Sequence, residues 1–153
     1  MSRFSYDDAL IRRTLAEARV VAMVGASPRA DRPSHGVMRF LQQKGHRVYP
    51  VNPVCAGETI HGETVLAALA DVPEAIDMVD IFRRSAEAGA AVDDAVAAGA
   101  RIIWMQLDVI DEEAAARAEA AGLTVIMDRC PVIEYRRLGA EGPKPAGPAQ
   151  TSR

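Results

Sequence analysis

One short stretch holds most of the residues that could contact an anion, namely Gly25, Ala26, Ser27, Arg32, Ser34 and His35. It follows the apolar run Val20–Val24, which is typical of a buried strand, and it leads into a helix. Small residues at such a turn let backbone N–H groups approach an anion, and the helix dipole favours negative charge. The stretch therefore predicts a site for a phosphate-bearing ligand. The alternative is a plain strand-to-helix connection that binds nothing.

Residue types at the ends of the other expected strands narrow the choice of ligand. We expect the same crevice to be lined by Val51, Asn52, Pro53, Phe82, Arg83, Met105 and Gln106. An NAD-binding domain places an acidic residue at the end of its second strand, and this chain has no carboxylate there. Ser27 also stands where G-x-G-x-x-G has its second glycine. Both features disfavour NAD and leave NADP, coenzyme A (CoA) or another phosphorylated adenosine open. Arginine at the rim of a crevice suits phosphate oxygens.

The other reactive side chains do not form a catalytic or metal-binding pattern. His35, His46 and His61 lack metal-ligand spacing, and we interpret His46 as a strand-edge residue. Cys130 has no base placed beside it by any motif, so we expect it to be structural. Asp80 lies in an expected buried strand, where we expect it to bind backbone groups near the crevice. No catalytic residue is predicted.

The composition excludes several classes of function. The formal net charge is −3 and aromatic residues make up 5% of the chain, which argues against nucleic-acid binding. No apolar run approaches the ~20 residues of a membrane span, and the polar start of the chain is unlike a signal peptide. The two cysteines lie far apart in a chain that does not need a disulfide. We therefore expect a cytoplasmic protein that binds a small molecule.

The periodicity alternates between strands and helices along most of the chain. Strands are expected at 20–24, 46–51, 76–82, 101–107 and 123–127. Helices are expected at 6–18, 34–44 with Ser34 as the N-cap, 63–70, 85–98 and 111–121, and the last structured segment is expected at 130–138. Glycine separates helix from strand three times, at Gly45, Gly99 and Gly122.

This alternation predicts a Rossmann-like, doubly wound α/β fold. Its five-stranded, mainly parallel sheet has the order 3-2-1-4-5 and carries helices on both faces, with the ligand crevice where the order reverses. We assign residues 1–138 to a single domain. Residues 139–153 are rich in proline and glycine, and we expect them to be a disordered tail.

Several motifs in fixed order resemble those of the small stand-alone CoA-binding domain proteins, which are similar to the N-terminal domain of the succinyl-CoA synthetase α subunit. The resemblance covers Val20 to Leu138, and the matching segments are Val24-Gly25-Ala26-Ser27, Val48-Tyr49-Pro50-Val51-Asn52-Pro53, Asp80-Ile81-Phe82-Arg83, Trp104-Met105-Gln106 and Asp128-Arg129-Cys130-Pro131.

The resemblance implies a fold that binds CoA through its ADP part. Ser27 and the loop to His35 would meet phosphates, Asn52 and Pro53 would flank the nucleotide, and Met105 and Gln106 would line the pantetheine or diphosphate side. The ligase subunit carries a lysine shortly after its counterpart of Asn52-Pro53, whereas this chain has Val54-Cys55-Ala56. The ligase's phosphohistidine lies in a second domain that this chain lacks, so ligase chemistry is not implied.

The function expected from the sequence is binding of CoA or an acyl-CoA, without evident catalysis. Two alternatives stay open. One is an NADP-dependent reductase-like nucleotide-binding protein, and the other is an interaction module that senses CoA and docks on a partner protein.

Overall fold

A five-stranded parallel sheet forms the centre of the computed structural model, which describes residues 5–143. Every neighbouring pair of strands in this sheet is parallel. From one edge to the other, the strands are β2 (Arg47–Val51), β1 (Val20–Val24), β5 (Met78–Ile81), β6 (Ile102–Met105) and β7 (Thr124–Ile126). The predicted Rossmann-like α/β fold is confirmed.

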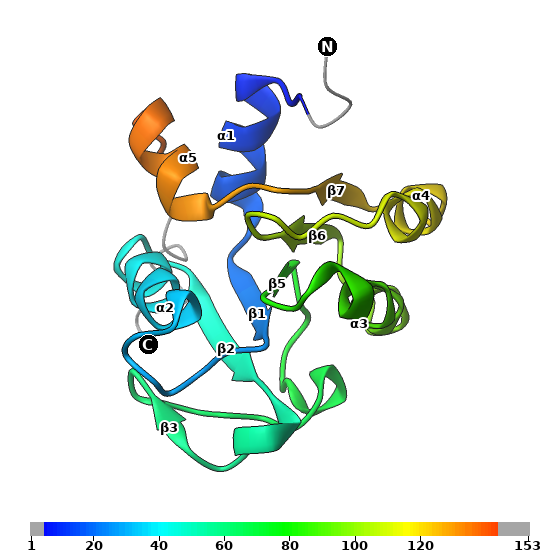
Figure 1. Cartoon of the computed structure of the whole chain (residues 1–153). Helices are drawn as coiled ribbons and strands as arrows, with labels where there is room; N and C mark the ends of the chain where they lie inside the picture. The colour runs from blue at the N-terminus through cyan, green and yellow to red at the C-terminus, as the bar shows by residue number, and fades with distance from the viewer. Residues whose placement is uncertain (1–4, 144–153) are drawn as a thin grey trace.

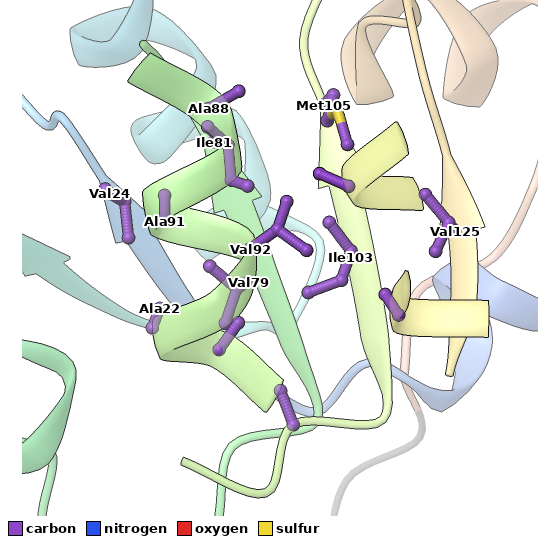
Figure 2. Close-up of a cluster of buried hydrophobic side chains, with 14 of the residues drawn as sticks. Ala22, Val24, Val79, Ile81, Ala88, Ala91, Val92, Ile103, Met105 and Val125 are labelled. Atoms are coloured by element: carbon purple, nitrogen blue, oxygen red, sulfur yellow. The ribbon is translucent and has the colours of Figure 1, made fainter. Parts of the chain in front are cut away.

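Helices cover both faces of the sheet (Figure 1). One face carries α1 (Asp8–Glu17), α2 (Pro33–Gln43) and α5 (Pro131–Leu138), and the other carries α3 (Ser85–Ala97) and α4 (Glu112–Ala120). Alternate side chains of a strand point to opposite faces. In β1, Val21 and Met23 therefore pack with the first group, and Ala22 and Val24 pack with the second. Figure 2 shows this second cluster, in which small side chains of α3 let the helix lie close to the sheet.

The connection between β2 and β5 differs from the prediction. Residues 63–70 were expected to form a helix, but the chain forms the hairpin β3 (Thr59–Ile60) and β4 (Glu63–Thr64) and two short 3₁₀ helices, Pro53–Cys55 and Leu69–Asp71. His61 and Gly62 both have positive φ at the hairpin turn. The backbone of Leu66 then pairs with the outer edge of β2, by donating to Pro50 O and accepting from Asn52 N. Pairing with this edge satisfies backbone groups that a helix would have satisfied locally.

The same segment explains the strand order. The expected third strand, now β5, lies beside β1 rather than beyond β2, so the five strands read 2-1-3-4-5 in chain order. The position beyond β2 is held by Leu66, which forms a parallel bridge with Val51. With this short segment counted as the third strand, the predicted 3-2-1-4-5 pattern holds. The direction of winding reverses between β1 and β5, and the carboxyl ends of these strands are the expected place for a ligand.

His46 is not the strand-edge residue that the sequence suggested. It is 4% exposed, and its two ring nitrogens lie 2.6 Å from Ala18 O and 2.6 Å from Tyr135 Oη. These contacts join the end of α1 and the start of β2 to α5. Burial lowers the pKa of His46, and the hydrogen bond to Ala18 only partly offsets this effect. Burial also raises the pKa of Tyr135, so both groups are neutral at neutral pH.

The packed part of the chain extends beyond Leu138. Gly139 ends α5 in the left-handed conformation, Ala140 is 7% exposed, and Pro143 is buried. Gly142 lies so close to Lys44 that a Cβ on it would overlap the Lys44 carbonyl oxygen. The predicted start of a disordered tail at residue 139 is therefore wrong for residues 139–143. The rest of that prediction lies outside the described residues.

The buried neutral His46 predicts a specific pH dependence of stability. The pKa of His46 is lower in the folded protein than in the unfolded chain. The contribution of His46 to the free energy of unfolding is therefore present above the unfolded pKa of about 6.5 and is lost as pH falls. Between pH 7.5 and pH 5, the wild-type melting temperature should fall relative to that of His46→Gln. His35→Gln serves as the matched control. If the melting temperatures of wild type and His46→Gln changed with pH by the same amount, this would contradict a buried neutral imidazole.

The packing of residues 139–143 predicts that two truncations differ. A chain that ends at Leu138 loses the Ala140 and Gly142 contacts, whereas a chain that ends at Pro143 keeps them. The shorter protein should be less stable by about 1 kcal/mol, which corresponds to about 2–4 °C in melting temperature for a domain of this size. Thermal unfolding followed by circular dichroism measures the difference. Equal melting temperatures would show that these contacts contribute nothing.

Candidate functional site

A cleft of about 900 Å³ lies at the carboxyl ends of β1, β5 and β6. Its walls come from the loop between β1 and α2, the first turns of α2 and α3, and the loop after β6. Eight of the thirteen residues predicted for the site line it: Gly25, Ser27, Arg32, Ser34, Asn52, Phe82, Arg83 and Gln106.

The other five predicted residues do not line this cleft. Ala26 and Met105 are 1% and 0% exposed, because their side chains point into the two cores on either side of the sheet. The His35 ring contacts that of His61 in a tilted arrangement, with a centroid separation of 4.1 Å. Val51 and Pro53 line a second groove of about 530 Å³, on the α3 face of the sheet. This groove shares Arg83 and Glu87 with the cleft, so the two spaces are contiguous.

Gly25 serves the sheet rather than an anion. Its φ is +86°, and a Cβ on it would overlap the carbonyl oxygen of Phe82. Its N–H donates to Val51 O at 2.9 Å and is not available to a phosphate. The sequence pattern therefore singled out Gly25 correctly as an essential residue, but it indicated anion binding rather than strand packing as the role of the glycine. Glycine is needed because the ends of β1 and β5 come close together.

Two polar side chains hold the glycine loop in shape. Ser34 is not the N-cap of α2 but a residue of its first turn, and its Oγ accepts from Ser27 N at 3.0 Å. Asn52 Nδ2 donates to Ala26 O at 3.0 Å, while Asn52 Oδ1 accepts from Val54 N. These bonds tie the end of β2 and the start of α2 to the loop. The loop is fixed before any ligand arrives.

Arginine supplies the positive charge of the cleft. Arg29 pairs with Asp31 at 3.0 Å, and Arg84 pairs with Glu87 at 3.2 Å. Within residues 5–143, no ion pair is formed by Arg32 or Arg83, which both line the cleft. The first turns of α2 and α3 also face this space, and helix N-termini favour anions. The cleft is therefore suited to a ligand with more than one negative group.

Beyond Gln106, the loop after β6 lines the cleft with residues 107–109, which were not predicted as part of the site. Asp108 lines the cleft in a left-handed conformation, with φ of +68°. Its N–H donates to Asp128 Oδ1 at 2.7 Å, and its carbonyl accepts from Ser85 Oγ at 3.1 Å. Asp128 also has a positive φ, of +59°. Strained backbone often gathers at functional sites. The sequence pointed to this loop only through its polar residues, Asp108 and Asp128, which follow β6 and β7.

Asp80 and Gln106 form a buried polar pair at the base of the cleft. Asp80 is 0% exposed, and its Oδ1 accepts from Gln106 Nε2 at 2.8 Å. Burial raises the pKa of Asp80 to about 7, although the bond from Gln106 works in the opposite direction. The expectation that Asp80 binds backbone groups is wrong, because a side-chain amide is its partner. Asp77 instead has a backbone role, since it accepts from Val20 N at 2.8 Å.

Groups for covalent or metal chemistry are sparse around the cleft. Cys130 lines it as the N-cap residue of α5 and is half-buried. The lining residues include no histidine. Within the described part of the chain, no three His, Cys, Asp or Glu side chains are grouped so that they could hold a metal ion. In the same residues, no helix has the length and apolarity needed to cross a membrane.

The sequence pattern of the CoA binding domain family matches residues 19–136. This chain belongs to the CoA binding domain family. The matched segment begins just before β1 and ends within α5. It therefore contains every element that forms the cleft.

The chain is also similar to proteins of known sequence or structure. The uncharacterized protein YneT of Bacillus subtilis (strain 168) is 34% identical over 122 residues, which cover 80% of this chain and 89% of YneT. A hypothetical protein from Pyrococcus horikoshii OT3 has 33% identity and a TM-score of 0.85, with 92% of this chain and 97% of that chain covered.

A third similar structure belongs to a larger protein. The dinucleotide-forming acetyl-coenzyme A synthetase 1 of Ca. Korarchaeum cryptofilum, in complex with phosphate and ADP, is 26% identical with a TM-score of 0.63. The match covers 78% of this chain and 27% of that chain. A structure similar to this chain thus forms part of a larger synthetase.

The buried Asp80 predicts a stability effect opposite in sign to that of His46. Its pKa is higher in the folded protein than in the unfolded chain, so its contribution is present at low pH and is lost as pH rises from about 4 to about 7. Asp80→Asn still accepts from Gln106 and removes the ionisation. The free energy of unfolding of Asp80→Asn, relative to that of wild type, should be higher at pH 8 than at pH 5. The expected gain is ~1.4 kcal/mol for each unit by which folding shifts the Asp80 pKa. An equal difference at both pH values would be inconsistent with a buried, protonated carboxyl.

Proposed function

We propose that this protein binds CoA or an acyl-CoA in the cleft at the carboxyl ends of β1, β5 and β6. The observation that carries the proposal is that Arg32 and Arg83, beside two helix N-termini, form no ion pair with a carboxylate of residues 5–143. CoA has a diphosphate and a 3′-phosphate, and guanidinium groups bind phosphate oxygens through paired N–H donors. Membership of the CoA binding domain family supports the same ligand.

The second groove supports an extended nucleotide rather than a single phosphate. It adjoins the cleft at Arg83 and is lined mainly by apolar side chains, such as Val24, Val51 and Leu69. A flat, largely apolar adenine ring suits such a surface. We infer that the adenine lies in this groove, with Arg83 between the base and the phosphates.

The end of β2 argues against NAD. A carboxylate that could bind the ribose 2′-hydroxyl is absent from Val51, Asn52 and Pro53. The Asn52 side chain is already bonded to Ala26 O and Val54 N. A reductase that uses NADP stays as the second candidate, because a 2′-phosphate would also suit the unpaired arginines. The proposal concerns binding alone, since the cleft places no histidine beside Cys130.

Calorimetric titration with CoA, acetyl-CoA, NADPH and NADH tests the proposal. We expect CoA or acetyl-CoA to bind at least tenfold more tightly than NADH, a difference of about 1.4 kcal/mol. Arg32→Gln and Arg83→Gln should each weaken CoA binding about tenfold, because each removes a charged phosphate contact. The matched control is Arg39→Gln, since Arg39 is exposed on α2 and does not line the cleft. Preferred binding of NADH, or full CoA affinity in both cleft variants, would refute the proposal.

A further inference from the structure

The buried Asp80–Gln106 pair lowers the stability of the fold and has no evident structural role. Asp80 lies in the middle of β5, where its neighbours in the adjacent strands are the buried Met23 and Trp104. A carboxyl group at such a position loses its hydration, and burial without full hydrogen bonding is destabilising. Asp80 Oδ2 is the one buried side-chain oxygen or nitrogen within residues 5–143 that has no hydrogen-bond partner. An apolar side chain would pack here at lower cost.

The pair fixes the orientation of an amide in the ligand cleft. Gln106 follows β6 and lines the cleft, although only 6% of it is exposed. Its Nε2 is directed to Asp80 Oδ1 at 2.8 Å. The amide oxygen, Oε1, is therefore turned away from Asp80 Oδ1, because Oδ1 accepts the Gln106 N–H whether or not Oδ2 carries a proton.

The amide oxygen is free to meet a ligand. Within the described residues, Gln106 Oε1 accepts no hydrogen bond from the protein. It is also accessible to solvent, because among residues 5–143 the only buried side-chain oxygen or nitrogen without a partner is Asp80 Oδ2. An accessible acceptor with a fixed direction is a site for an N–H or O–H donor of the ligand.

The geometry points to Asp80 as a positioning residue that turns the Gln106 amide oxygen toward the cleft, where it accepts a hydrogen bond from an amide N–H of the ligand's pantetheine arm. This inference rests on the proposed binding of CoA. The pantetheine arm contains two amide groups, whereas adenosine 3′,5′-bisphosphate has the same base and 3′-phosphate without that arm. The pair would thus distinguish a pantetheine-bearing nucleotide from the nucleotide alone.

The test compares the two ligands on four variants. Gln106→Leu removes the acceptor, and Asp80→Leu removes the group that orients it. Each should weaken CoA binding about tenfold, as expected for one hydrogen bond to a buried group. The affinity for adenosine 3′,5′-bisphosphate should stay within about twofold. The double variant should lose no more CoA affinity than Gln106→Leu alone, because both changes remove the same interaction.

Asp80→Asn is the conservative variant that separates positioning from charge. Its Oδ1 can still accept from Gln106 Nε2, so CoA affinity should be restored to within about twofold of wild type. If Asp80→Leu does not fold, Gln106→Leu still decides the question, together with the side-chain amide signals of Gln106 in ¹⁵N-labelled wild-type protein. These signals should shift on addition of CoA and not on addition of adenosine 3′,5′-bisphosphate.

The failures of the two proposals are distinguishable. If wild-type protein binds neither ligand, the proposed function is wrong. If it binds CoA but Gln106→Leu weakens both ligands equally, or neither, the function stands and the positioning role is overturned. Equal loss of both ligands in Asp80→Leu, with no rescue by Asp80→Asn, would show that Asp80 only supports the fold.

Discussion

The close approach of β1 and β5 at Gly25 and Phe82 is the constraint on which the rest of the structure depends. Phe82 N donates to Val24 O, and Gly25 N donates to Val51 O, so the ends of three strands are joined at one point. A side chain at Gly25 would overlap the Phe82 carbonyl and separate these strands. Because the chain leaves the sheet here in two opposite directions, the loops that follow diverge and leave the cleft between them. The cleft is thus a consequence of strand pairing.

The polar residues around the cleft divide into two groups. Ser34, Asn52 and Ser85 use their side chains to hold the loops, through bonds to backbone N–H and carbonyl groups. Arg32 and Arg83 have no ion-pair partner within residues 5–143. A site organised in this way loses little conformational entropy when it binds, because its backbone is already fixed. The charges of these two arginines are then available to a ligand in the cleft.

The link between β2 and β5 shapes the second groove. A helix in this position would have covered the sheet beside α3, but the chain forms a hairpin and a bridge from Leu66 to Val51 instead. The sheet face next to α3 is therefore covered only by short segments, which leaves the apolar groove that adjoins the cleft at Arg83. The link between β2 and β5 forms no α-helix, and for the same reason the apolar groove beside α3 stays open as a binding surface.

The sequence by itself determined the elements whose signals are local. Apolar runs such as Val20–Val24 indicated buried strands, and alanines on one side of residues 85–98 indicated a helix packed on the sheet. Glycines after three helices marked their ends, because a left-handed residue there depends only on the neighbouring backbone. The sequence also placed Arg32 and Arg83 at the rim of the cleft, because the loops that follow parallel strands lie at one edge of the sheet.

Only the tertiary structure decided the features that depend on partners distant in sequence. The hairpin replaced the expected helix because the backbone of Leu66 found an unpaired edge of β2. His46 became buried because Ala18 and Tyr135 meet its ring from two other elements. Asp80 and Gln106 are 26 residues apart, and neither pattern nor propensity shows that their side chains bond. Each of these outcomes is set by a hydrogen-bond partner that the three-dimensional fold brings near, and local sequence does not contain that information.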